Sequence, residues 1–316
     1  LHVEPQGVLG CAGGGFSANS YDSYTEKNNL ARTSYPESYS KSSDYNESYT
    51  LTTLLTYSKT FAKKHELKVM AGYEARSSFG AGLNATATSF PVAIAESFSL
   101  STNPNKVAGG SLSYGRFLSQ FGRLNYAYSN KYLLTANIRR DGSTKFSPAH
   151  RWGVFPSVSG GWKINEEPFF KNLSQNVITL LKPRISWGIL GNDAAIGNFA
   201  YQSSYQQVGQ HSFDEQAIVG GFNSIKVVNK DIKWEEVHSI NYGLDINMFQ
   251  DKLSFTAEYY DRQTRDMLYN LPTPPSSGIA AYYSATSTMP VNIGKISNKG
   301  WEVSLSYQNR LGDFTY

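Results

Sequence analysis

The sequence has 316 residues, of which 40% are hydrophobic, and its mean hydropathy of -0.41 disfavours a soluble α/β enzyme. The formal net charge of +4 is mild and scattered, so a nucleic-acid partner is not indicated, and the single Cys11 excludes an internal disulfide framework. Aromatic residues reach 14%, with 22 Tyr, 17 Phe and 27 Gly, and this composition favours an all-β chain with tight turns. No stretch approaches the ~18 uncharged apolar residues of a transmembrane helix, whereas a membrane-crossing strand needs only about 9–11 residues of alternating character.

The N-terminal part of the chain gives the weakest signal. Residues 1–48 are rich in Gly, Ser, Asn and Tyr and show no sustained periodicity, so we expect an irregular segment there. From residue 50 an alternating pattern predicts strands at 50–61 and 66–75 around a short break. A long polar connection is then expected over residues 77–113.

Further strands follow along the chain, and a short helical turn is expected at Pro168, a residue suited to the first helical position. The strands are predicted at residues 120–129, 131–140, 152–164, 183–191, 241–248, 253–259 and 301–309, with another pair at 201–208 and 217–228.

The clearest hairpin spans residues 241–259. Tyr242, Leu244, Ile246 and Met248 alternate with polar residues, and after a break at 250–252 the alternation resumes. The hairpin therefore has one apolar and one polar face.

Short and long connections alternate along the whole series of strands, as in transmembrane β-barrels with short turns at one end and long loops at the other. A soluble β-sandwich also alternates, but its apolar face points into a shared core. Tyr and Trp residues near strand ends favour the barrel because aromatic girdles mark the membrane interfaces. The candidate interface residues are Tyr128, Trp152, Trp162, Tyr259 and Trp301.

The segment RRDGSTKFSPAHRWGVFPSVSGGWKINEEPFF, residues 139–170, resembles the SusC/RagA family of TonB-dependent outer-membrane transporters. The resemblance covers roughly residues 50–312 and departs from the family at Pro183 and over residues 1–20. It continues, in order, through LKPRISWGILGNDAAIGNFAY (181–201), KDIKWEEVHSINYGLDINMF (230–249), YYDRQTRDMLYN (259–270) and NIGKISNKGWEVSL (292–305).

This resemblance implies an antiparallel transmembrane β-barrel of 22 strands filled by an N-terminal plug domain. The chain would supply about ten to twelve strands of the barrel, and the plug is expected to lie outside the sequence. We therefore divide the chain into residues 1–48, irregular, and residues 49–316, a partial TonB-dependent receptor barrel.

The resemblance also implies a function and partners. We expect active import of an oligosaccharide or a peptide across the outer membrane of a Gram-negative bacterium. The partners would be a SusD-like surface lipoprotein, TonB acting through the plug, the nutrient itself and outer-membrane lipid. The alternatives that remain open are a passive porin and a surface β-sandwich adhesin.

Ligand-contacting residues are harder to predict than the fold. Tyr282 and Tyr283 lie in a long loop and could stack on a sugar ring, although packing against neighbouring loops is the more ordinary role. Asp141, Gly142 and Ser143 are expected to form a turn. Trp234 is expected to be an interface anchor rather than a sugar platform.

Catalysis is not indicated. The candidate histidines His65, His150, His211 and His238 are far apart and lack the spacing of a zinc site. The sequence shows neither a nucleophile elbow nor a phosphate loop, and the adjacent Glu166 and Glu167 do not suggest a glycosidase pair. We expect no enzyme activity, no cofactor and no metal site.

Overall fold

The computed structural model describes residues 8–25, 38–90, 98–103, 107–170, 177–213, 217–224, 226–274, 276, 288–311 and 314–315. The chain divides into two compact units. The larger unit contains Leu1–Gly10, Thr53–Glu74 and Leu118–Tyr316, and the smaller unit contains Cys11–Thr52 and Ala75–Phe117.

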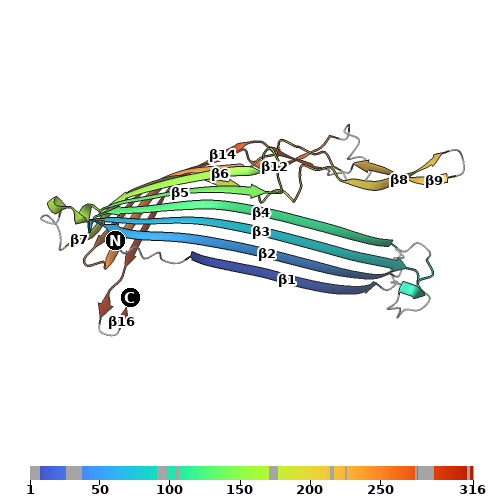
Figure 1. The fold of residues 1–316 in the computed structure, drawn as a ribbon, viewed down its shortest axis with the longest axis horizontal. Helices are drawn as coiled ribbons and strands as arrows, with labels where there is room; N and C mark the ends of the chain where they lie inside the picture. Colours follow the sequence, from blue (N-terminus) through green and yellow to red (C-terminus); the bar gives the residue numbers. More distant parts are fainter. Residues whose placement is uncertain are drawn as a thin grey trace. The chain divides into compact units, whose positions relative to one another are not determined.

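Strands dominate the described residues, and helices are short (Figure 1). Residues 168–170 form the helical turn expected at Pro168. The elements are β1 (Val8–Thr25), β2 (Ser38–Phe61), β3 (His65–Thr88), η1 (Phe98–Leu100), β4 (Val107–Tyr128), β5 (Tyr132–Ser143), β6 (Trp152–Trp162), η2 (Ile164–Glu166), β7 (Ile178–Asn192), β8 (Tyr205–Phe213), β9 (Ala217–Ser224), β10 (Glu235–Met248), β11 (Leu253–Arg265), β12 (Leu268–Pro272), β13 (Thr288–Asn292), β14 (Lys295–Tyr307), β15 (Arg310–Leu311) and β16 (Phe314–Thr315).

Ten strands follow one another in the hydrogen-bonded order β1-β2-β3-β4-β5-β6-β7-β10-β11-β14. Three strand pairs, β8–β9, β12–β13 and β15–β16, form separate two-stranded sheets. The pairs β5–β6, β6–β7 and β10–β11 are antiparallel. The long sheet ends on β1 and β14 without closing, so it matches the predicted partial wall of an antiparallel barrel.

In the larger unit, β10, β11 and β14 share one apolar and one polar face. Tyr242 lies opposite Tyr259, which lies opposite Trp301. The next row on this face joins Leu244, Ala257 and Val303. This apolar face is open, since Trp301, Val303 and Leu305 are 75%, 66% and 67% exposed. The predicted hairpin and its two faces are thus confirmed.

The same two faces continue across β5 and β6. The polar face carries the side chains of Asn137, Arg139 and Asp141 from β5. Large hydrophobic side chains on the opposite, apolar face are exposed to solvent, namely Tyr132, Leu134, Ile138, Trp152, Val154, Val158 and Trp162. Because side chains alternate along a strand, residues two positions apart point to the same face.

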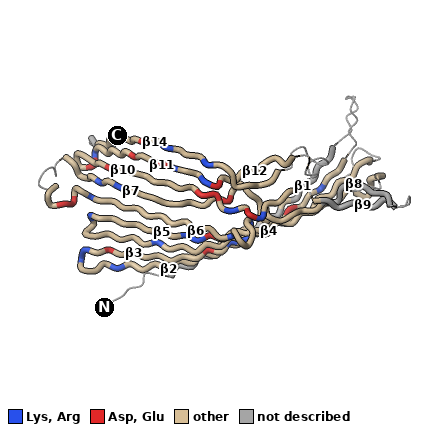
Figure 2. The backbone as a smooth tube through the Cα atoms, turned by 90° about the horizontal axis from the view of Figure 1, so that it is seen from above, with Lys and Arg blue, Asp and Glu red and all other residues tan. Residues whose placement is uncertain are grey.

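Short turns gather at one end of the strands of the larger unit. Backbone hydrogen bonds join successive turns: Ser129 N donates to Lys64 O at 2.6 Å, and Lys163 N donates to Lys131 O at 2.8 Å. Phe249 N likewise donates to Val177 O at 2.8 Å. In Figure 2, basic residues mark the turn between β2 and β3, and acidic and basic residues are frequent where the long connections begin. The predicted alternation of short and long connections fails at one place, because the connection between β6 and β7, residues 163–177, is longer than the connection between β5 and β6, residues 144–151.

Two parts of the chain differ from the sequence-based expectation. Within residues 1–48, which we expected to be irregular, β1 spans Val8–Thr25 and β2 begins at Ser38. About half of the expected polar connection over residues 77–113 is also strand, since β3 continues to Thr88 and β4 begins at Val107. Backbone pairing needs no apolar face, so hydropathic alternation gives no signal where both faces are polar.

The smaller unit contains the ends of β2, β3 and β4 that lie nearest their long connections, together with most of β1. Its buried hydrophobic residues are Tyr39, Ala87 and Phe90, and Phe98 packs against them. The rings of Tyr39 and Phe98 lie 4.8 Å apart. Within the described ranges, no helix is both long enough and apolar enough to cross a membrane.

The turn between β2 and β3 stores backbone strain. Ala62 and Lys63 have φ values of 50° and 54°, and Lys64 N donates to Phe61 O at 3.3 Å. This is the geometry of a two-residue turn that favours Asn-Gly. Replacing Ala62 and Lys63 by Asn and Gly should raise the free energy of unfolding of the full-length protein by about 1 kcal/mol, measured by urea titration.

A matched control lies at the next position. Lys64 is not among the described residues with positive φ, so Lys64→Gly should lower the free energy of unfolding or leave it unchanged. Equal stabilisation by both changes would contradict the strain at Ala62 and Lys63.

Candidate functional site

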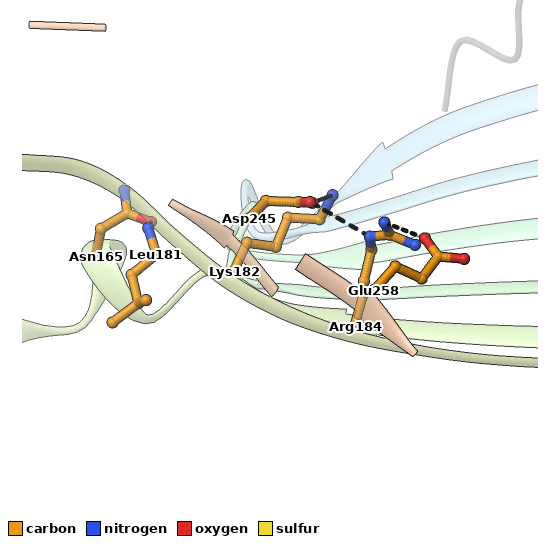
Figure 3. Close-up of polar contacts among 6 residues, drawn as sticks. All are labelled: Asn165, Leu181, Lys182, Arg184, Asp245 and Glu258. Atoms are coloured by element: carbon orange, nitrogen blue, oxygen red, sulfur yellow. Dashed lines mark hydrogen bonds and ion pairs between the residues drawn. The ribbon is translucent and has the colours of Figure 1, made fainter. Parts of the chain in front are cut away.

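The polar face of the larger unit is the candidate functional surface because its ionic side chains come from several neighbouring strands. The first group, here called the Arg184 network, contains Lys182, Arg184, Asp245 and Glu258 (Figure 3). Lys182 Nζ and Arg184 Nε lie 3.3 and 3.4 Å from Asp245, and Arg184 Nη2 donates to Glu258 Oε2 at 2.6 Å. Two cations thus match two carboxylates across β7, β10 and β11.

A glycine makes room for this network. A Cβ atom built on Gly243 would lie 2.5 Å from Arg184 Cζ and 2.8 Å from Arg184 Cγ. The arginine therefore lies flat over β10 on its way to Glu258 on β11. Glu258 is opposite Glu302 in the β11–β14 register, so Arg184 also offsets the repulsion between these two carboxylates.

A second group, here called the Arg139 network, lies on the polar face of β4 and β5. Arg139 Nε donates to both carboxylate oxygens of Asp141, at 2.7 and 2.8 Å. Ser119, which is fully buried, donates to Asp141 Oδ1 at 2.6 Å and accepts from Arg139 Nη2 at 2.7 Å. Each polar group in this triangle is satisfied by the other two.

The Arg139 network borders a hollow of about 650 Å³ on the polar face. Arg123 Nε donates to Asn137 Oδ1 at 2.6 Å, and Asn137 Nδ2 donates to Ser157 Oγ at 3.0 Å. These residues line the hollow together with Phe121, Phe155 and Ser186. A surface of this chemistry can hydrogen-bond to water, to polar polymer substrates or to another protein segment.

An apolar group, here called the Trp234 cluster, lies where the long connections meet the polar face. Phe146 and Ile232 are fully buried, and Trp234 and Phe155 are each 6% exposed. The Trp234 ring lies 4.9 Å from the Phe146 ring and 5.4 Å from the Phe155 ring. Its Nε1 donates to Arg151 O at 3.1 Å. The expectation that Trp234 is an interface anchor is therefore wrong, because the connections bury it.

Glu235, the next residue, is a buried carboxylate that joins three elements. Its Oε1 accepts from Asn192 Nδ2, and its Oε2 accepts from Leu268 N, each at 2.9 Å. Both oxygens are thus satisfied by groups at the end of β7 and the start of β12. The carboxylate fixes the position at which the long connection after β11 leaves the sheet.

Asp141, Gly142 and Ser143 do not form the turn that the sequence suggested. They are the last three residues of β5, and the turn follows them. Ser143 Oγ donates to Asp193 Oδ2 at 3.0 Å, and Lys145 Nζ donates to Asp193 O at 2.8 Å. The three residues therefore extend a strand, and Ser143 together with Lys145 holds the connection after β7.

Aromatic rings form a row along the short-turn end of the larger unit. The Tyr132 ring lies 6.2 Å from both the Tyr128 ring and the Trp162 ring. Glu167 accepts from Tyr132 OH at 2.8 Å, from Lys131 Nζ at 3.1 Å and from Trp162 Nε1 at 3.3 Å. These hydrogen bonds, that from Tyr132 above all, hold the pKa of Glu167 below its usual range.

A second row lies toward the long connections. The Tyr259 ring lies 4.9 Å from the Trp301 ring and 6.4 Å from the Tyr242 ring. Lys299 forms an ion pair with Asp261 at 2.9 Å one step further along the same face. On β5 and β6, the Arg140 guanidinium lies 4.3 Å from the centre of the Trp152 ring. Aromatic rings and charged side chains thus form the boundary of the apolar face at the end of the strands that leads into the long connections.

The structure separates the candidates that the sequence singled out. Trp152, Trp162 and Trp301 are exposed on the apolar face, the Tyr128 ring stacks beside the exposed Tyr132 ring, and the Tyr259 ring is tilted against the Trp301 ring. Tyr282 and Tyr283 lie outside the described residues. Among the residues that the structure does describe, no His, Cys, Asp and Glu side chains gather as a metal site.

Sequence reasoning missed both ionic networks. Lys182, Arg184, Asp245 and Glu258 are spread over more than seventy residues of sequence, and no local motif joins them. Their common signal is weak: each is a charged residue on the polar side of an alternating strand. Their pairing follows only from the strand register.

An antiparallel sheet with one exposed apolar face, a polar face with ionic networks, and aromatic rows at both limits defines the wall of a transmembrane β-barrel. The sequence model of the protein family described as TonB dependent receptor-like, beta-barrel, matches residues 10–316. The chain belongs to this family, in which it is SusC/RagA-like.

Similar proteins bear names in keeping with this family. TonB-dependent receptor P39 of Formosa agariphila (strain DSM 15362) is 36% identical over 251 residues, which cover 79% of this chain and 23% of that protein. TonB-dependent receptor SusC of Bacteroides thetaiotaomicron is 36% identical over 203 residues, covering 63% of this chain and 19% of SusC. The chain thus spans about a quarter or less of the length of these relatives.

A solved structure shares the fold. The structure of the RagAB peptide transporter matches 96% of this chain and 32% of its own, with a TM-score of 0.81 and 24% sequence identity. A second structure, of the RagAB peptide importer in the open-open state, matches with a TM-score of 0.79. At 24% identity, these matches show that the chains share a fold.

The space above Gly243 can be tested by substitution. Gly243→Ala should displace Arg184 from Asp245 and Glu258 and lower the free energy of unfolding by about 1–2 kcal/mol, because charge-assisted hydrogen bonds are lost. The control is Gly160→Ala, where an added Cβ would meet its nearest atoms at 3.9–4.0 Å. Urea unfolding of the two full-length variants measures the difference. Equal effects would show that Arg184 does not need the space.

The lowered pKa of Glu167 predicts a pH dependence with a definite sign. The unfolded chain takes up this proton near the ordinary value of 4.5, whereas the folded chain resists protonation, so stability is full at neutral pH and falls as the solution is acidified below that value. Glu167→Gln should reduce this acid-induced loss, measured as the urea midpoint at pH 7 and about pH 4. An unchanged pH dependence in the variant would contradict the role of Glu167.

Proposed function

We propose that this chain forms part of the barrel wall of an active, TonB-dependent importer in the outer membrane of a Gram-negative bacterium. Its apolar face contacts lipid, and its polar face lines the lumen. The observation that carries the proposal is the exposed apolar face, bounded by aromatic rows and followed by charged residues. A bilayer is the solvent that suits such a face.

The spacing of the aromatic rows supports this placement. Trp152 and Trp162 are the first and last residues of β6, so they lie about 34 Å apart along the strand. A tilt of about 35–45° projects this length to about 25 Å, the height of the apolar band in outer-membrane barrels. We propose that Tyr128 and Trp162 lie at the periplasmic interface, and that Trp152, Tyr259 and Trp301 lie at the outer one.

The imported nutrient is proposed to be an oligosaccharide or a peptide. The support for a peptide is the name of a similar structure, the RagAB peptide transporter, and the support for an oligosaccharide is the resemblance to the SusC/RagA family. The polar side chains around the hollow suit either polymer, because both offer donors and acceptors along their length. Tyr282 and Tyr283 remain candidates for contact with this substrate.

The partners follow from the same proposal. A SusD-like surface lipoprotein would capture the nutrient, and TonB would act through a plug domain outside this sequence. In keeping with this, the chain covers 32% of the RagAB chain that it matches, which leaves room for such a domain in a full-length protein.

The two alternatives expected from the sequence, a β-sandwich adhesin and a passive porin, are less well supported than the importer, for different reasons. A β-sandwich needs a second sheet over the apolar face, and in the part of the chain that the structure describes Trp301, Val303 and Leu305 stay exposed. A passive porin would share the wall geometry, but family membership favours the active importer.

A transport experiment separates the importer from the porin. Cells carrying the full-length gene are compared with deletion cells for uptake of labelled oligosaccharide and peptide mixtures, with and without functional TonB. Uptake that requires both the gene and TonB supports the proposal, and the mixture that is taken up names the substrate class. Uptake that requires the gene but persists without TonB would identify a porin instead.

Adjacent residues of β11 provide a matched test of the two faces. Ala257 lies between Leu244 and Val303 on the apolar face, whereas Thr256 lies between Asp245 and Ser304 on the polar face. Ala257→Arg should cost about 2–4 kcal/mol in lipid vesicles, and Thr256→Arg less than about 1 kcal/mol. Urea unfolding from vesicles measures both. A larger cost for Thr256→Arg would reverse the assignment of the faces.

A further inference from the structure

A groove of about 530 Å³ runs over the apolar face where β2, β3, β4 and β5 lie side by side in the larger unit. Ala71 and Gly122 are the small residues of its floor. Its sides include Leu55, Tyr73 and Ile138, which are 53%, 38% and 55% exposed. These hydrophobic side chains stand up around a low floor and leave the space between them open.

Gly122 keeps the groove open. A Cβ atom built on Gly122 would meet Ile138 Cγ2 and Met70 O at 3.8 Å, an ordinary contact distance. The backbone therefore accepts a larger residue at this position, and such a residue would fill the groove rather than distort the strand. The space results from side-chain size and can be closed without a steric clash at Cβ.

One cation borders the groove. Of the residues that line it, Arg140 alone is charged. Its guanidinium lies 4.3 Å from the centre of the Trp152 ring, and this ring covers Gly142, where a Cβ atom would lie 2.8 Å from it. Stacking on an aromatic ring leaves the edge of a guanidinium, with its N–H donors, available for an anion. The neighbouring Asp141 belongs to the polar face.

We propose that the groove binds an anionic membrane lipid, with an acyl chain along Ala71 and Gly122 and the lipid phosphate held by Arg140. The inference rests on the proposed function, since it requires the apolar face to contact the bilayer. Charge complementarity selects the occupant: an apolar channel that ends at a single arginine matches an acyl chain that ends at a phosphate. The position of Arg140 beside Trp152 places the phosphate at the outer interface.

Lipid retention by the full-length protein tests this inference. The protein is purified in mild detergent, supplied with dipalmitoyl phosphatidylglycerol and examined by native mass spectrometry for one retained lipid. Arg140→Gln removes the cation, and Gly122→Leu fills the groove while leaving the cation in place. Each change should weaken retention about tenfold, because charge-assisted contacts to phosphate and close apolar packing are both lost.

Two control variants lie on the same face but outside the groove. Lys299→Gln removes an equal charge, and Ala257→Leu adds similar bulk, so both should retain the lipid as the unchanged protein does. Loss of retention in these variants to the same degree as in Arg140→Gln and Gly122→Leu would show non-specific adhesion and overturn the proposal. Displacement of the lipid by millimolar inorganic phosphate alone would also overturn it, since the groove would then contribute nothing.

Failure of this inference differs from failure of the proposed function. If the protein fractionates with the outer membrane and unfolds cooperatively in detergent, but Arg140→Gln and Gly122→Leu retain lipid unchanged, the lipid site is wrong and the importer stands. If the protein is soluble and monodisperse without detergent, the membrane placement itself fails.

Discussion

The pairing of backbone hydrogen bonds between neighbouring strands is the constraint on which this structure depends. A strand in hydrocarbon has no water to satisfy its amides, so every donor and acceptor must be paired inside the sheet. The series of antiparallel neighbours from β2 to β7 and then β10, β11 and β14 provides this pairing. Once the register is set, alternate side chains point to opposite faces, so a single strand presents apolar side chains to the lipid and polar side chains to the lumen.

The polar face then has to accommodate long charged side chains, and in both networks each arginine is paired with a carboxylate. Arg184 does so by lying over Gly243 and pairing with carboxylates on two strands. Arg139 uses a carboxylate on its own strand and a buried serine on the next. In both networks, a small residue beside a large one lets the side chain lie along the wall, so the surface stays polar and close to charge-balanced.

Alternation of residues such as Tyr242, Leu244 and Ile246 predicted the hairpin and both of its faces, because a half-buried strand has a strict period of two. The same signal fails in β1, whose sequence is rich in Gly and Ser and shows no sustained alternation. Trp234 was misjudged because burial by the long connections depends on contacts with Phe146 and Phe155, which are far away in sequence. The ionic networks were invisible for the same reason: register, rather than spacing, joins Lys182 to Asp245.

The orientation of the two faces is the central claim, and spin labels along β11 test it most directly. Single cysteines replace residues 254–259 of the full-length protein in lipid vesicles, with Cys11 changed to Ser, and each label is exposed to oxygen and to a water-soluble nickel chelate. The account predicts a period of two, with the label at Ala257 relaxed by oxygen from the lipid and the label at Thr256 relaxed by the chelate. The reverse pattern, or equal access at both positions, would contradict it.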